Sequence, residues 1–94
     1  MKGYWIARVN IKNQNAYKSY AQLAKPAIEK HNGRYLARGG KQKILEGLEL
    51  ERAVIVEFPS MAKALECYNS KEYAEAKSHR EGAAEFHGVI VEGI

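Results

Sequence analysis

AVIVEF, residues 53–58, is the stretch that identifies the chain as one built around a β-sheet. Four of its six residues are Val, Ile or Phe, and β-branched and aromatic side chains favour extended backbone because they pack well on a pleated surface. Pro59 and Ser60 follow. Proline is excluded from the interior of a sheet, and serine caps helices. The stretch therefore predicts a strand Ala53–Phe58 that ends in a turn and leads into a helix.

Three other stretches are also predicted to be strands. Tyr4–Val9 is aromatic and β-branched without a breaker, and His87–Glu92 contains the run Val-Ile-Val. Arg34–Arg38 starts with apolar alternation and is followed by Gly39–Gly40, a glycine pair that bends or bulges a strand. The polar residues 41–51 then form a hairpin-like connection to the strand described above.

The first helix is predicted between two of these strands. Tyrosine, alanine and isoleucine recur at helical spacing over Tyr17–Ile28, after asparagines at 13–15 whose side chains cap helices. Asn32–Gly33 should end this helix, because these residue types tolerate the left-handed conformation. Pro26 lacks an N–H and predicts a kink or a restart within the helix.

Two more helices are predicted between the third and last strands, over Met61–Tyr68 and from Lys71 to about Ala84, the second of them capped by Ser70. The order of elements is then β, α, β, β, α, β. This order predicts an α+β, ferredoxin-like fold, in which one four-stranded antiparallel sheet carries the helices on one face. No linker or repeat divides the chain, so residues 1–94 are expected to form a single domain.

The composition is that of a globular protein, with 46% hydrophobic and 28% charged residues. The net charge of +4 is spread along the chain rather than gathered into a basic tract, so no nucleic-acid partner is expected. Cys67 is the only cysteine, and it cannot form an internal disulfide. No apolar run reaches membrane-spanning length. We therefore expect a soluble cytoplasmic protein without a membrane partner.

Alternation along the strands divides their side chains into two sets. The wholly apolar set, expected under the helices, is Trp5, Ala7, Val9, Tyr35, Ala37, Val54, Val56, Phe58, Val89 and Val91. The second set, which also carries charges, is Tyr4, Ile6, Arg8, Leu36, Arg38, Ile55, Glu57, Ile90 and Glu92. The second face is too apolar to remain in water, so we expect a homodimer in which two such sheets close face to face.

Arg38, Gly39 and Gly40 form a candidate ligand contact. Glycines without side chains allow a ligand to approach the backbone beside a fixed cation. The motif lacks the spacing of a phosphate loop or a dinucleotide fingerprint. An alternative remains, in which the glycines form a bulge and Arg38 pairs with Glu57 or Glu92 across a dimer interface.

The helix that follows Ser70 carries a second candidate. Tyr73, Lys77 and Arg80 lie at i, i+4 and i+7, which places a phenol, an ammonium and a guanidinium along one stripe. Such donors suit a carboxylate or phosphate, and the phenol could also act as a general acid. The alternative is an ordinary solvated helix face with Tyr73 in the core.

The sequence does not predict a metal or a cofactor. His31, His79 and His87 lack the spacing of a metal site and have no second cysteine to join them. Cys67 has no evident base beside it, and a lone cysteine on a helix is more often a small buried apolar residue.

Several spaced motifs resemble one family. KGYWIARV at the N-terminus, GRYLARGG over Gly33–Gly40, VIVEFPS over Val54–Ser60, YNSKEYAEAKSHR over Tyr68–Arg80 and the closing VIVEG are similar to the DUF1330 family, and the resemblance covers nearly the whole chain. It implies a dimeric α+β barrel, in which two ferredoxin-like sheets close a barrel across a dimer interface.

The resemblance also implies which polar positions matter. Carried over to this chain, the recurrent polar residues of the family motif are Arg38, Gly39, Gly40, Tyr68, Ser70, Glu72, Tyr73, Lys77 and Arg80. The family commonly has proline after the serine, where this chain has Lys71. Proline there only preorganises the first helical turn, so the helix is still expected.

The resemblance does not give a reaction, because the wider superfamily includes cofactor-independent monooxygenases, lactone isomerases and haem enzymes. Our leading hypothesis is a homodimer that binds a small anionic metabolite between sheet and helices, with Arg38 as anchor and Tyr73 and Arg80 as further donors. In an isomerase, decarboxylase or cofactor-independent oxygenase, Tyr73 or one of Glu57 and Glu92 would move the proton. The rival is a non-catalytic binding or structural module, and nucleic-acid binding is a weaker third class.

Overall fold

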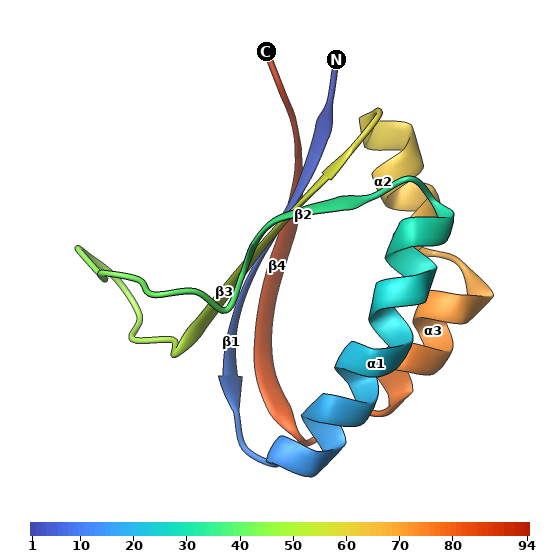
Figure 1. Ribbon diagram of the computed structural model, residues 1–94. Coiled ribbons are helices and arrows are strands. Elements are labelled where there is room, and N and C mark those ends of the chain that lie inside the picture. The colour runs from blue at the N-terminus through green and yellow to red at the C-terminus, as the bar shows by residue number, and fades with distance from the viewer.

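A computed structural model describes residues 1–94 and contains one sheet with three helices. Figure 1 shows the helices together on one side of the sheet, while the connection 39–51 extends away from them. The elements are β1 (Gly3–Ile11), α1 (Gln14–Lys30), β2 (Arg34–Arg38), β3 (Arg52–Phe58), α2 (Met61–Tyr68), α3 (Lys71–Ser78) and β4 (Ala84–Glu92).

The sheet has four strands in the order β2-β3-β1-β4, and every neighbouring pair is antiparallel. The two halves of the chain thus interleave, with β1 and β3 at the centre, which is the ferredoxin-like arrangement. The predicted fold class is confirmed. None of the helices combines the length and the apolar character needed to span a membrane.

Side-chain caps set the starts of the helices, as the sequence predicts. Asn13 accepts a hydrogen bond from the backbone N–H of Ala16 at 3.1 Å, and Ser60 and Ser70 cap α2 and α3 in the same way. Asn32, just after α1, has a φ of 63°, the left-handed conformation that ends a helix. Pro26 does not restart the helix, because α1 is a single span through it.

The ends of two elements differ from the prediction. α3 ends at Ser78 rather than near Ala84, and β4 starts at Ala84 rather than at His87. Gly82 explains the change, since its φ of 71° turns the chain in a conformation that a helix cannot continue. The longer β4 brings Phe86 into the sheet, opposite Val9.

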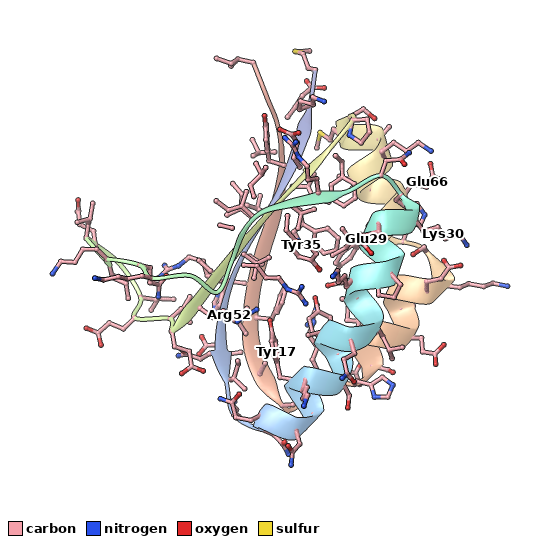
Figure 2. All side chains as sticks on the ribbon, viewed as in Figure 1. Tyr17, Glu29, Lys30, Tyr35, Arg52 and Glu66 are labelled. Carbon is pink, nitrogen blue, oxygen red and sulfur yellow. The ribbon has the colours of Figure 1, made fainter.

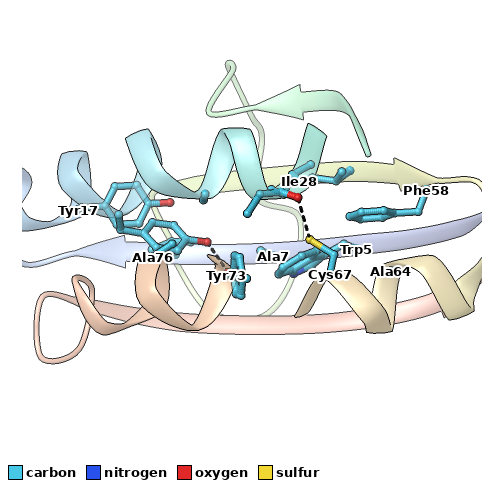
Figure 3. Packing of buried hydrophobic residues seen from close by; sticks show 14 residues of the cluster. Trp5, Ala7, Tyr17, Ile28, Phe58, Ala64, Cys67, Tyr73 and Ala76 are labelled. Carbon is cyan, nitrogen blue, oxygen red and sulfur yellow. Dashed lines mark hydrogen bonds between the residues drawn. The ribbon is translucent and has the colours of Figure 1, made fainter. Parts of the chain in front are cut away.

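The core lies between the sheet and the helices and is rich in aromatic side chains (Figure 3). Trp5 stands at its centre, with its ring centroid 4.8 Å from that of Tyr73 and 6.0 Å from that of Phe58. Tyr20 and Tyr73 join α1 to α3 through a hydrogen bond between their hydroxyls, 2.5 Å apart. Pairing satisfies two hydroxyls that burial would otherwise leave without partners.

The two faces of the sheet are called the covered face and the open face below. Side chains of the covered face point toward the helices: Gly3, Trp5, Ala7, Val9, Tyr35, Arg38, Arg52, Val54, Val56, Phe58, Phe86, Gly88, Ile90 and Glu92. Those of the open face point away: Tyr4, Ile6, Arg8, Arg34, Ala37, Ala53, Ile55, Glu57, His87, Val89 and Val91. The predicted assignment is correct for β1 and β3.

The assignment is wrong for the end of β2. Tyr35 pairs with Val56, but the next paired residue, Ala37, lies opposite Ile55 because Leu36 is an extra residue in a bulge. Alternation is therefore reset, so that Ala37 belongs to the open face and Arg38 to the covered face, opposite Val54.

The assignment is also wrong for β4. Trp5 pairs with Ile90, so Ile90 and Glu92 belong to the covered face, whereas Val89 and Val91 belong to the open face and are 56% and 45% exposed. The Val-Ile-Val run is apolar on both sides, so its residues alone do not fix the register. The bulky Phe86 does, because its ring packs against Tyr20 beneath the helices.

Candidate functional site

The space between sheet and helices opens to the surface in two places. One is a groove of about 690 Å³ between β4 and the helices α2 and α3. The other is a cavity of about 30 Å³ between α1 and the strands β2 and β3. Trp5 and Phe86 line both of them. Of the predicted anion-binding residues, Arg38 lines the cavity and Tyr68, Lys77 and Arg80 line the groove, whereas Gly39, Gly40 and Ser70 line neither.

The groove has a largely apolar lining with two cations. Trp5, Leu65 and Phe86 contribute apolar surface, while Lys77 and Arg80 reach the groove from α3 and the turn after it. Glu81 is the one acidic residue of the lining. A groove of this size lies within the roughly 300–1,000 Å³ typical of ligand sites.

Lys77 is held in place by Tyr68. Its ammonium donates a hydrogen bond to the phenol oxygen at 3.3 Å and lies 4.6 Å from the centroid of the ring. Both residues are half-buried. An ammonium fixed by a neutral partner keeps its full charge available for an anion.

Arg80 is the deeper cation of the groove. Its guanidinium carbon lies 3.7 Å from the centroid of Phe86 and 5.1 Å from that of Tyr20. Its Nε is buried and has no hydrogen-bond partner. Burial lowers the pKa of Arg80, but the nearby Tyr73 and Tyr20 raise it further, so the pKa is raised overall. The guanidinium is therefore charged.

Unlike Lys77 and Arg80, Tyr73 does not contribute to the surface of the groove. It is fully buried, and burial raises its pKa. Its hydroxyl meets Tyr20 rather than solvent, as in the alternative that places it in the core. Ser70 likewise has local partners, since its hydroxyl donates to the carbonyl oxygen of Cys67 at 2.7 Å and accepts from the N–H of Tyr73.

The two predicted carboxylates lie elsewhere. Glu57 is on the open face, where its carboxylate accepts a hydrogen bond from Arg34 at 3.2 Å. Glu92 is at the far end of β4, opposite Gly3, and is exposed. The structure therefore does not bring Glu57, Glu92 and Tyr73 to one place. Their roles as proton carriers stay a prediction.

The cavity beside α1 contains Arg38 and a residue that the sequence reasoning missed, Arg52. In Figure 2, Tyr17, Tyr35 and Arg52 lie in the layer between the sheet and α1. Gly39 adjoins Arg52 so closely that a Cβ on it would collide with the guanidinium. Counting back by two from Val54 would have placed Arg52 on the covered face.

Candidate metal ligands do not gather anywhere in the chain. No three His, Cys, Asp or Glu side chains come close enough to hold one ion. Cys67 is buried in the core, where its thiol faces the carbonyl oxygen of Ala27 at 3.7 Å. Burial raises the pKa of this thiol to about 12, which makes it a poor nucleophile near neutral pH.

Solved structures resemble this chain over its whole length. A protein of unknown function from Rhodopseudomonas palustris is 21% identical, with 99% of this chain and 82% of that chain covered, at a TM-score of 0.80. A dimeric ferredoxin-like protein of unknown function from Bacteroides fragilis is 12% identical, with 98% and 96% covered, at 0.66. SnoaB, a cofactor-independent oxygenase from Streptomyces nogalater, is 5% identical, with 99% and 93% covered, at 0.67.

These likenesses establish the fold alone, because identity is low. No curated protein matches the sequence. A family model described as a domain of unknown function, DUF1330, matches residues 2–94. The match extends over nearly every residue from which the sheet, the groove and the cavity are built. On that ground the chain belongs to the DUF1330 family.

Proposed function

We propose that the protein binds a small metabolite with an apolar or aromatic body and a negatively charged group, in the groove between β4 and the helices α2 and α3. The observation that carries the proposal is a pair of cations, Lys77 and Arg80, in an apolar groove without carboxylate partners. The ion pairs of the structure involve other residues.

The chemistry of the groove fits such a ligand. Leu65 and Val89 are 42% and 56% exposed and, beside the half-buried ring of Phe86, offer apolar surface for the body. An aromatic ring favours a flat apolar group. An anion held by Lys77 and Arg80 would make charge-assisted hydrogen bonds, which are about twice as strong as neutral ones. The unpartnered Nε of Arg80 is a polar atom whose burial costs free energy until it gains an acceptor.

We also infer that the functional form is a homodimer closed through the open face. This face has an apolar patch made of Ile6, Ile55, Val89 and Val91. In a single chain, Val89 and Val91 are 56% and 45% exposed. Monomers rarely leave such a patch in water. Structurally similar proteins from Bacteroides fragilis and Thermobifida fusca are described as dimeric. Val89 also lines the groove, so a partner on the open face would border the site.

The groove is tested by isothermal titration with aromatic carboxylates, each paired with its uncharged primary amide. Carboxylates should bind more tightly than amides, and Lys77→Gln should reduce that preference at least about tenfold, because a charge-assisted hydrogen bond contributes about 1.5–3 kcal/mol. Lys71→Gln is the matched control, since Lys71 is exposed on the same helix and does not line the groove. Equal losses of the preference for carboxylates in Lys77→Gln and Lys71→Gln would show that Lys77 does not bind the anion.

The homodimer is tested separately by light scattering on a size-exclusion column. The parent should elute with the mass of two chains, and Val89→Glu should yield a folded monomer, because it places a charge among the apolar side chains of the proposed interface. A parent that is monomeric at micromolar concentration would contradict the dimer and leave the groove proposal standing.

The groove would suit either a non-catalytic binding protein or an enzyme. SnoaB shares the fold and is a cofactor-independent oxygenase, but fold analogy does not assign a reaction. Catalysis by Tyr73, Glu57 or Glu92 therefore stays a prediction.

A further inference from the structure

We propose that Arg38 and Arg52 form a second anion site, distinct from the groove, which binds a phosphate-sized dianion at the mouth of the cavity between α1 and the strands β2 and β3. The juxtaposition that carries the proposal is two guanidinium groups on adjacent strands, on the same face, with no acidic residue in the lining of the cavity they share.

The bulge in β2 creates this pair. With Leu36 as the extra residue, Arg38 lies opposite Val54, and Arg52 is two residues from Val54 on the same side of β3. Diagonal neighbours of this kind are about 7–8 Å apart in an antiparallel pair. Both arginines line the cavity beneath α1. Without the bulge, Arg38 would point to the open face, away from Arg52.

The two charges lack protein counterions. They are the only charged residues among the 13 that line the cavity, and neither takes part in an ion pair. The Nε of Arg52 is buried without a hydrogen-bond partner. Glu51, the neighbour of Arg52 in sequence, is engaged elsewhere, since its carboxylate accepts from the N–H of Ile11 at 2.7 Å. Like charges held together repel, and an anion relieves the repulsion.

Aromatic rings pack against both guanidinium groups, and a glycine leaves room for that of Arg52. Arg38 lies 4.6 Å from the centroid of Tyr35, and Arg52 lies 5.7 Å from that of Tyr17. Stacking occupies the faces of a guanidinium and leaves the N–H groups at its edge free to bind an oxyanion. Gly39 leaves room for Arg52, because a Cβ at that position would overlap with the guanidinium as it lies here.

The size of the cavity and its charge select the ligand. About 30 Å³ holds only a few water molecules, so the body of a metabolite cannot enter without movement of α1. Two guanidinium groups carry two positive charges, which a phosphate dianion balances and a single carboxylate does not. A phosphate group held at the mouth, either free or at the end of a larger molecule, meets both limits.

Titration with inorganic phosphate at constant ionic strength tests the site. Calorimetry measures the affinity for phosphate, and thermal unfolding measures the shift of the unfolding midpoint. Phosphate should raise the midpoint of the parent, as any ligand of the folded state does. Arg38→Gln and Arg52→Gln should each lower the affinity at least about tenfold, since each removes a charge-assisted contact. In phosphate-free buffer, Arg38→Gln should be no less stable than the parent, because it removes a repulsion.

Arg34→Gln is the matched control, because Arg34 is on the same strand but belongs to the open face, where it pairs with Glu57. It should leave the phosphate response unchanged, and so should Lys77→Gln in the groove. An equal response in Arg34→Gln, Arg38→Gln and the parent would overturn the proposal, as would a parent that does not respond to phosphate. Arg38 is exposed, so Arg38→Gln remains a fair test if Arg52→Gln fails to fold.

Methyl phosphate distinguishes the two sources of the phosphate group. Binding as tight as that of inorganic phosphate would support the end group of a larger ligand, because the methyl group then points out of the mouth. Binding of inorganic phosphate alone would support a free anion enclosed by the two arginines. Binding of neither would contradict the site without affecting the aromatic carboxylate experiment on the groove.

Discussion

Side chains along the same strands alternate between the covered face and the open face of the sheet, yet the helices of the chain cover only one of these faces. Trp5, Val9, Val56 and Phe58 of the covered face are at most 4% exposed. Ile6 and Ile55 of the open face are half-buried, and Val89 is 56% exposed. Both faces are apolar, so hydrophobicity alone does not tell which one the helices cover. In the homodimer proposed above, the covered face would carry the stability of the single chain and the open face would meet the second copy.

The largest expected effect comes from truncating neighbours on opposite faces. Trp5→Ala removes the ring at the centre of the aromatic core and should lower the free energy of unfolding by about 3–5 kcal/mol. Ile6→Ala, one residue further on and on the open face, should cost much less in the monomer and act mainly on dimer formation. Urea unfolding at several protein concentrations measures both. Equal losses of unfolding free energy in Trp5→Ala and Ile6→Ala at low protein concentration would contradict the difference between the two faces.

A smaller effect is expected at the end of β2, where the covered face meets the loop. Gly39 has a φ of 68° and adjoins the guanidinium of Arg52, so Gly39→Ala should lower the free energy of unfolding by about 1–2 kcal/mol through left-handed strain. Gly40 has no atoms within 4 Å of where a Cβ would lie, and Gly40→Ala should be nearly neutral. Thermal unfolding of the two variants provides the measurement. A neutral Gly39→Ala would contradict the left-handed conformation of residue 39.

The smallest effect near neutral pH concerns the protons of helix residues that are buried against the covered face. Burial raises the pKa of Tyr20 and Tyr73, and it raises that of Cys67 to about 12. The ordinary values are 10.0 for a phenol and 9.0 for a thiol. Above about pH 9 the unfolded chain loses these protons while the folded chain keeps them, so the free energy of unfolding falls as pH rises.

Urea unfolding at a series of pH values from about 7 to about 11 should show that decline. The double variant Cys67→Ala and Tyr73→Phe should decline less steeply, because two of the titrating groups are gone. Tyr4→Phe on the open face is the control, and it should follow the parent. A parent whose stability rises over this range would contradict the burial of these groups.

The sequence predicts the fold well because its signals are local and repeated. Val54 to Phe58 and Tyr4 to Val9 alternate over whole strands, and the caps Asn13, Ser60 and Ser70 set the starts of three helices. Each signal needs only neighbours within a turn or a strand. The element order, and with it the ferredoxin-like fold, follows from them.

The candidate site was harder to predict, because it depends on pairing between strands. A single extra residue, Leu36, moves Arg38 from the predicted open face to the covered face, and alternation within β2 alone cannot reveal a bulge. The stripe of Tyr73, Lys77 and Arg80 was expected to act together, but the first of these turns into the core. Arg52 was missed because it precedes the part of β3 whose pattern is distinctive.

Because of the bulge at Leu36, the face of the sheet on which Arg38 lies depends on the number of residues in β2 rather than on their types. Deletion of this one exposed leucine would restore simple alternation and turn Arg38 to the opposite side of the sheet. The composition of the protein would lose one apolar residue and no charge. Such a deletion would nevertheless exchange an arginine on the covered face for one on the open face. A single codon therefore separates two chains that would appear almost identical in an alignment but carry their positive charge on opposite sides.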